Sequence, residues 1–174
     1  MDKKVNIPFD RKTARDFRIG DYVYLTGEVY VARDAAHKRM MEALDRGEEL
    51  PFDIKNQTIY YMGPSPAREG RPIGSAGPTT SGRMDRYAPR LLDMGQTGMI
   101  GKGKRTQEVR DAISRNGAVY FAAVGGAGAL LSKCITASEI ISYEDLGAEA
   151  LRKITIKDFP VIVVMDSQGG NMYE

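Results

Sequence analysis

Cysteine and histidine are almost absent from this chain, whose 174 residues include one of each, Cys134 and His37. A single cysteine excludes a disulfide within the chain, and it excludes a metal or iron–sulfur site held by several cysteines of this chain. Long apolar runs are also missing. No stretch approaches the roughly 18 to 20 apolar residues of a membrane span, and the first residues form no apolar signal core. We therefore expect a cytoplasmic protein without membrane contact.

The chain also lacks a large excess of charge of either sign. Its 25 lysine and arginine residues are scattered among 23 aspartate and glutamate residues, which leaves a net charge of +2. Nucleic-acid-binding surfaces are usually far more basic, so we expect no nucleic acid partner. A hydrophobic content of 42% and a charged content of 28% suit one folded domain over residues 1–174.

β-rich runs alternate with amphipathic segments along the chain, which predicts an α/β fold with a sheet-rich core flanked by helices. Gly27 divides the first β-rich run, consistent with a hairpin or with consecutive strands of one sheet. We interpret residues 63–77 as an ordered functional loop; a flexible tether is the alternative. We expect strands at 22–26, 28–32, 58–62, 97–100, 118–124, 151–156 and 160–165, and helices at 34–46, from about 85 to 95, at 106–115 and briefly at 129–133.

Residues 77–85, Gly-Pro-Thr-Thr-Ser-Gly-Arg-Met-Asp, place two glycines, three hydroxyl side chains and one arginine in a loop before a helix. A helix start presents unpaired N–H groups, and a planar guanidinium beside it suits a carboxylate or phosphate. Thr79 and Arg83 are therefore candidates for an anion-binding loop. An ordinary capped turn has the same residue types, and spacing alone leaves both interpretations open.

Two further basic positions follow predicted strands. Arg33 comes after the first β-rich run, with Asp34 as the expected N-cap of the next helix, and Lys102 follows the strand at 97–100. Loops at strand ends of α/β folds gather into one cleft, where several cations can bind a small dianion. We favour a cleft position for Lys102, whereas Lys104 and Arg105 are expected to be solvent-exposed.

Three other features are better interpreted as structural than as catalytic or ligand-binding. His37 falls beside the apolar face of the helix at 34–46, which favours a packing histidine over a general base. Cys134 lies among apolar residues without a nearby partner in the sequence and is expected to be a small core residue. The glycine-rich turn at 125–128 lacks the spacing and the ribose-binding acid of a dinucleotide site.

Four motifs together resemble a known family: Val-Ala-Arg-Asp-Ala-Ala-His-Lys at 31–38, the motif at 77–85, Gly-Lys-Gly-Lys-Arg at 101–105, and Gly-Gly-Ala-Gly-Ala at 125–129. Their order is similar to that in the C-terminal domain, or separate β subunit, of class I fumarate hydratases. The β subunit of L(+)-tartrate dehydratase is similar as well. The resemblance extends through 143–160 and implies a swivelling β/β/α domain.

The resemblance implies an iron–sulfur hydro-lyase that interconverts fumarate and (S)-malate. A 4Fe-4S cluster would be bound by a partner α subunit and not by this chain, in agreement with the single cysteine. By matching motif, Arg33, Arg83 and Lys102 would bind substrate carboxylates, and Thr79 would be the base that moves the proton at carbon. A threonine hydroxyl is a poor base in water, so this role needs neighbouring cations or a hydrogen-bond relay.

The resemblance also implies an α2β2 assembly that is active only when the α subunit is present. Relatives commonly have Ala-Lys-Gly-Asn-Arg where this chain has Gly-Lys-Gly-Lys-Arg at 101–105, a more basic loop that bears on substrate preference. Two alternatives stay open. The chain could serve a tartrate dehydratase or a related hydroxy-dicarboxylate dehydratase, or it could be a non-catalytic dicarboxylate-binding module.

Overall fold

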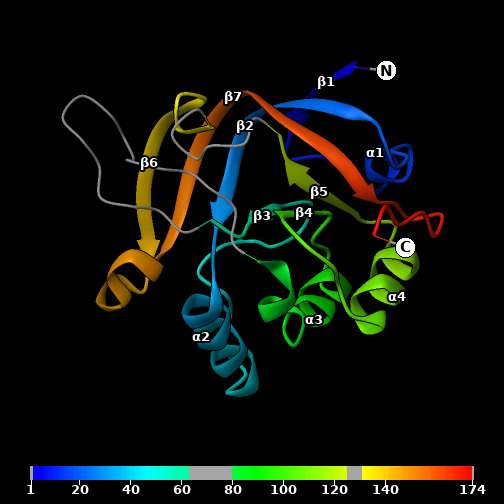
Figure 1. The fold of residues 1–174 in the computed structure, drawn as a ribbon. Helices are drawn as coiled ribbons and strands as arrows, with labels where there is room; N and C mark the ends of the chain where they lie inside the picture. The colour runs from blue at the N-terminus through cyan, green and yellow to red at the C-terminus, as the bar shows by residue number, and fades with distance from the viewer. Residues whose placement is uncertain (1, 63–79, 125–130, 174) are drawn as a thin grey trace.

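Strands and helices alternate through most of the chain (Figure 1). The computed structural model describes residues 2–62, 80–124 and 131–173. Its fold is mixed α/β with a sheet-rich core, as the sequence predicts. The strands are β1 (Asp2–Ile7), β2 (Tyr22–Val31), β3 (Thr58–Tyr60), β4 (Gly98–Gly101), β5 (Val119–Ala123), β6 (Ile135–Ser142) and β7 (Leu151–Met165). The α-helices are α1 (Arg11–Arg15), α2 (Asp34–Asp45), α3 (Ala88–Asp93) and α4 (Gln107–Asn116), with short 3₁₀ helices η1 (Ser81–Met84) and η2 (Glu144–Glu149).

Within the described residues the strands form one sheet in the order β1-β2-β3-β4-β5-β7-β6. An additional pairing of β2 with β7 closes a ring through β2, β3, β4, β5 and β7. β2, β3, β4 and β5 run parallel to one another, whereas β7 is antiparallel to both β2 and β5. The carboxyl ends of the four parallel strands therefore lie at one edge, where α2 follows β2 (Figure 1).

Successive strand residues contribute to two separate apolar cores, because side chains alternate between the faces of a strand. Tyr60 of β3 and Phe121 of β5 belong to a core shared by the strands and α1. Their neighbours Ile59 and Tyr120 belong to the other core, which includes side chains of α2, α3 and α4. Figure 1 shows these three helices together on one side of the sheet. Helices α2, α3 and α4 therefore cover one face of the sheet, whereas on the other face the strand side chains pack with one another and with α1.

Two predicted breaks in strands are wrong. β2 runs without interruption through Gly27, which has a φ of +137°. A Cβ at Gly27 would lie 2.1 Å from the carbonyl oxygen of Ile7, so the glycine permits close approach of β1 and does not make a turn. β7 likewise continues through residues 157–159, where Asp158 has a φ of +48°. These two places face each other in the β2–β7 ladder, which is interrupted by a bulge between the pairs Leu25–Phe159 and Gly27–Ile156 and continues on both sides of it.

Three helix boundaries also differ from the prediction. Residues 81–84, expected as loop, form η1, and the next helix begins at Ala88 instead of residue 85 or 86, with Pro89 in its first turn. Arg33 occupies the N-cap of α2, whereas Asp34, the expected cap, is the first helical residue. The carboxylate of Asp34 pairs with Arg83 instead of with its own helix backbone.

Two strands were not expected from the sequence. β1 is partly polar, and β6 carries Ala137, Ser138 and Glu139 at its centre. Among the strands that the structure describes, β1 pairs only with β2, and β6 pairs only with β7. Strands at a sheet edge expose polar side chains, so their hydrophobic signal is weak. In the described ranges no helix combines the length and apolar character needed to cross a membrane.

Candidate functional site

The carboxyl edge of the parallel strands holds the three cations that the sequence singles out. Arg33 follows β2 at the N-cap of α2, and Lys102 follows β4 directly. Arg83 lies in η1, whose preceding residue Thr80 forms a parallel bridge with Lys102. Polar contacts link these segments, because Arg83 pairs with Asp34 beside Arg33. The structure therefore gathers the three cation-bearing segments at one edge of the sheet.

Arg33 has extended backbone geometry, with φ −116° and ψ −159°, immediately before α2. Its carbonyl oxygen accepts hydrogen bonds from the backbone N–H of His37 at 2.9 Å and from His37 Nδ1 at 2.8 Å. The Nε of Arg33 is buried and has no hydrogen-bond partner in the part of the chain that the structure describes. A buried guanidinium nitrogen without a partner is suited to an added acceptor such as a carboxylate.

Arg83 and Lys102 both present exposed side chains. The Arg83 side chain is 55% exposed, and its Nη2 lies 2.5 Å from Oδ2 of Asp34. Lys102 is also exposed, although we favoured a cleft position for it. Both cations therefore lie at the surface of the described part of the chain.

A buried hydroxyl, that of Ser81, holds the Arg83 segment against the Lys102 segment. Its Oγ accepts hydrogen bonds from the backbone N–H of Lys102 at 3.0 Å and from the hydroxyl of Tyr120 at 2.7 Å. Its own N–H donates to the carbonyl of Lys102 at 2.8 Å. A Cβ at Gly101 would lie 1.9 Å from Ser81 Oγ, so glycine is required there for this close approach.

Arg105 is buried, and our prediction of a solvent-exposed side chain is wrong. Its Nε donates to Oδ1 of Asp85 at 2.6 Å, and both side chains are at most 4% exposed. The guanidinium lies 4.6 Å from the ring centroid of Tyr120 and 5.2 Å from that of Tyr61. Oδ2 of Asp85 accepts the N–H of Thr106, the N-cap of α4. Arg105 is therefore a structural cation beneath the site, whereas Lys104 is exposed as expected.

His37 is fully buried, which confirms the prediction of a packing histidine. Its ring stacks on Tyr87 and meets Tyr61 edge to face. Burial lowers the pKa of His37 to about 4, and the hydrogen bond to the Arg33 carbonyl offsets this only in part. Because a carbonyl can only accept, Nδ1 carries the proton of the neutral ring. His37 therefore orders the loop that carries Arg33 and remains uncharged near pH 7.

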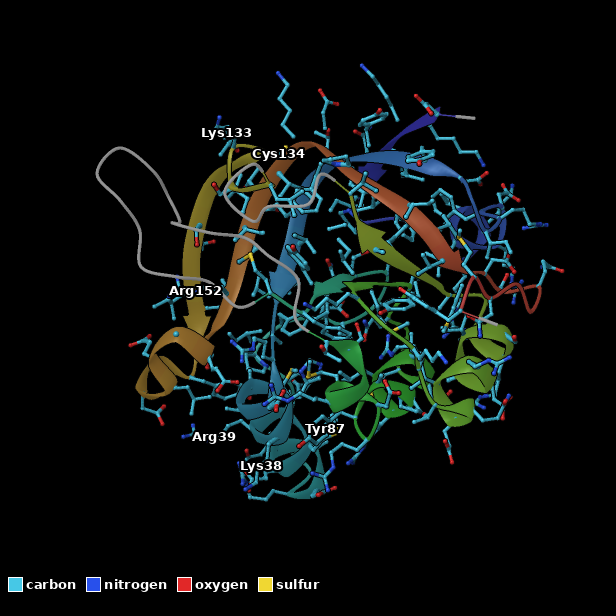
Figure 2. All side chains as sticks on the ribbon, in the orientation of Figure 1. Lys38, Arg39, Tyr87, Lys133, Cys134 and Arg152 are labelled. Carbon is cyan, nitrogen blue, oxygen red and sulfur yellow. The ribbon has the colours of Figure 1, made fainter. Side chains whose placement is uncertain are left out.

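Several predicted residues lie elsewhere. Thr79 and the glycine-rich turn at 125–128 lie outside the described residues. Cys134 is partly buried against the strand core, and burial raises the pKa of its thiol. Figure 2 shows Tyr87 next to α2, and Cys134 at the end of β6 that is remote from the helices. Cys134 is thus separated from the cation-bearing edge.

Four residues that organise the site were not identified from the sequence: Asp34 as a partner of Arg83, and Ser81, Asp85 and Tyr120. Ser81 and Asp85 belong to the motif at 77–85, so the sequence shows that they are close to Arg83 along the chain. Their partners lie 20 or more positions away in the chain. Such contacts depend on strand pairing, which residue spacing does not specify.

The fold is an α/β domain with cations at the carboxyl edge of parallel strands, beside the start of a helix, which is a place where α/β proteins commonly bind anions. A family model described as Fumarase C-terminus matches residues 2–174. The chain therefore belongs to the Fumarase C-terminus family, as its resemblance to class I fumarate hydratases and to the tartrate dehydratase β subunit implied.

Individual relatives agree with this assignment. The chain is 42% identical over 152 residues to "Fumarate hydratase class I, aerobic" of Salmonella typhimurium, covering 86% of this chain and 26% of that protein. It is 39% identical over 175 residues to "Fumarate hydratase 2" of Leishmania major, covering 99% of this chain and 31% of that one. The chain thus spans about a quarter to a third of these two fumarate hydratases.

A third relative is close to this chain in length. It comes from Methanocaldococcus jannaschii and is provisionally named L(+)-tartrate dehydratase subunit beta. Identity is 35% over 170 residues, which cover 94% of this chain and 87% of that protein. This relative is thus named as a separate subunit, and the match to this chain covers most of its length.

Proposed function

We propose that this chain is the β subunit of a two-chain iron–sulfur hydro-lyase that interconverts fumarate and (S)-malate by reversible addition of water. The observation that carries the proposal is the meeting of the segments bearing Arg33, Arg83 and Lys102 at one sheet edge. Fumarate and malate each have two carboxylates, which a set of separated cations can bind at both ends. The coverage of a relative named as a β subunit supports the two-chain arrangement.

In this proposal Arg33, Arg83 and Lys102 bind and orient the substrate carboxylates. Thr79 removes the carbon-bound proton in dehydration and returns it in hydration. The neutral His37 fixes the Arg33 carbonyl, and Ser81 keeps the Arg83 and Lys102 segments in register. Fixed placement of several charged groups lowers the entropy cost of reaching the reactive geometry.

The residues of this chain do not fit an iron–sulfur cluster. The sequence has one cysteine, and the described residues contain no group of three potential metal ligands among His, Cys, Asp and Glu. We therefore assign the 4Fe-4S cluster to a cysteine-bearing α subunit, where an open iron would act as a Lewis acid when the cluster is bound. An α2β2 complex is the proposed assembly, with the exposed cations facing the α subunit.

The test is anaerobic co-expression of this chain with a cysteine-bearing candidate α subunit. We expect the purified chain alone to show neither hydratase activity nor iron–sulfur absorbance, and the complex to show both. Assays on fumarate, malate and both tartrates separate the main proposal from a tartrate dehydratase, which the relative from Methanocaldococcus jannaschii favours. Activity of the chain reconstituted with iron on its own would refute the two-chain proposal. A complex that binds dicarboxylates without turnover would support the non-catalytic module.

Replacement of Arg83 by lysine is expected to raise KM and lower turnover in the complex. Lysine keeps the charge but loses the planar fork that matches a carboxylate. Loss of one charge-assisted hydrogen bond of about 1.5 to 3 kcal/mol corresponds to roughly a tenfold to hundredfold fall in kcat/KM. Arg90→Lys is the matched control, because Arg90 also pairs with an aspartate, Asp45, at the far end of α2. Equal kcat/KM for the two variants and the wild type would leave Arg83 without a role in substrate binding.

A further inference from the structure

Asp34 is an acidic residue among the cations at the carboxyl edge of the sheet. It follows Arg33 directly, and its Oδ2 lies 2.5 Å from Nη2 of Arg83. The side chain of Asp34 is 31% exposed, so the ion pair lies at the rim of the site and not in a core. A carboxylate in this position repels an anionic substrate. Its presence therefore needs an explanation other than charge attraction to the substrate.

Helix capping does not supply that explanation. The N-cap position of α2 belongs to Arg33, and no side-chain hydrogen bond caps the helix there. The N–H of Ala35 donates instead to Oε1 of Glu149 at 3.3 Å. Oδ1 of Asp34 is buried without a hydrogen-bond partner among the described residues. The ion pair with Arg83 is thus the contact that accounts for the orientation of the Asp34 carboxylate.

Arg83 can pair with Asp34 and still bind a substrate carboxylate. A guanidinium has five N–H groups in one plane, and the recorded ion pair joins Asp34 to Nη2 of Arg83. Among the described residues, Asp34 is the one partner of this guanidinium, and the Arg83 side chain is 55% exposed, so its other nitrogens can reach a ligand. An exposed arginine loses rotamer freedom when it binds a ligand, and an orientation fixed beforehand reduces that cost.

We propose that Asp34 is a positioning residue that holds the Arg83 guanidinium in the orientation in which it binds a substrate carboxylate. This inference rests on the proposed function. Because Asp34 adjoins Arg33, the same ion pair joins η1 to the start of α2.

The test uses the complex with the α subunit. Asp34→Asn removes the charge at nearly constant size, and it should lower kcat/KM about five- to thirtyfold, mainly through KM. Succinate, a dicarboxylate that is neither hydrated nor dehydrated here, should bind more weakly by a similar factor in calorimetry. Asp34→Glu keeps the charge and should recover part of the loss. In an Arg83→Lys background the same Asp34→Asn change should have less than about a twofold further effect, because the two residues act as a unit.

Asp45→Asn is the matched control, because Asp45 ends the same helix and pairs with Arg90 at 2.7 Å. It should leave kcat/KM and succinate binding unchanged, and thermal unfolding should show that both asparagine variants are folded. Tighter succinate binding by Asp34→Asn, wild-type kinetics, or an undiminished effect in the Arg83→Lys background would each overturn the positioning role. A wild-type complex that neither binds succinate nor turns over any of the four substrates would instead overturn the proposed function.

Discussion

Replacement of Asp85 by alanine is expected to lower the free energy of unfolding by about 3 to 5 kcal/mol, the usual loss when one partner of a buried ion pair is removed. The side chain of Arg105 is 0% exposed and that of Asp85 4%. Without Asp85, the guanidinium would remain buried between Tyr61 and Tyr120 with no countercharge. The N–H of Thr106 would also lose its acceptor at the start of α4.

Urea unfolding of the purified chain measures this loss, provided that the slope of the transition is unchanged. Asp45→Ala is the control, because it breaks an Asp–Arg pair whose side chains are 69% and 44% exposed. Such exposed pairs contribute about 0 to 1 kcal/mol. The double variant Asp85→Ala/Arg105→Met should regain much of the stability, since no buried charge is left unpaired. A loss for Asp85→Ala no larger than for Asp45→Ala would show that Arg105 is solvated in solution.

The mixed α/β fold could be predicted because its helices and central strands have clear periodicity. α2 and α4 end within about two residues of their expected positions, and β3, β4 and β5 match the apolar runs. The continuity of β2 through Gly27 could not be predicted, because a glycine that permits close approach of β1 cannot be distinguished in the sequence from a turn glycine. The edge strands β1 and β6 gave too little apolar signal to be distinguished from loops.

The meeting of the Arg33 and Lys102 segments could be predicted because these residues follow the parallel strands β2 and β4, whose carboxyl ends lie together. Which cation is solvated could not be predicted. Lys104 and Arg105 are neighbours in one basic loop, yet Lys104 is exposed and Arg105 is buried against Asp85. That difference depends on a partner 20 positions earlier and on two tyrosines from β5 and the end of β3. The roles of Asp34 and Ser81 likewise arise from contacts between segments, which no local motif encodes.

Thr79→Val is expected to lower turnover of the complex by roughly a hundredfold or more, the usual contribution of a positioned acid or base. Its neighbour in the sequence, Thr80, forms a bridge with Lys102, which follows β4. Substrate affinity should fall little, because Arg33, Arg83 and Lys102 still bind the carboxylates in the proposed site. A large fall in kcat with a nearly constant KM is therefore the expected pattern.

The competing interpretation is that Thr79 only caps the turn that follows it. Thr106→Val is the reference variant for the loss of a capping hydrogen bond. The side chain of Thr106 caps α4 by accepting the N–H of Val109, so its replacement should cost about 1 kcal/mol of stability and leave turnover nearly intact. Thermal unfolding, succinate binding and turnover are measured on the same preparation of each variant. If Thr79→Val reproduces the behaviour of Thr106→Val, with lower stability and near-normal turnover, Thr79 has no part in proton transfer. If it unfolds like the wild type, binds succinate and fails to turn over substrate, its hydroxyl is needed for chemistry, because stability and affinity are then excluded as causes.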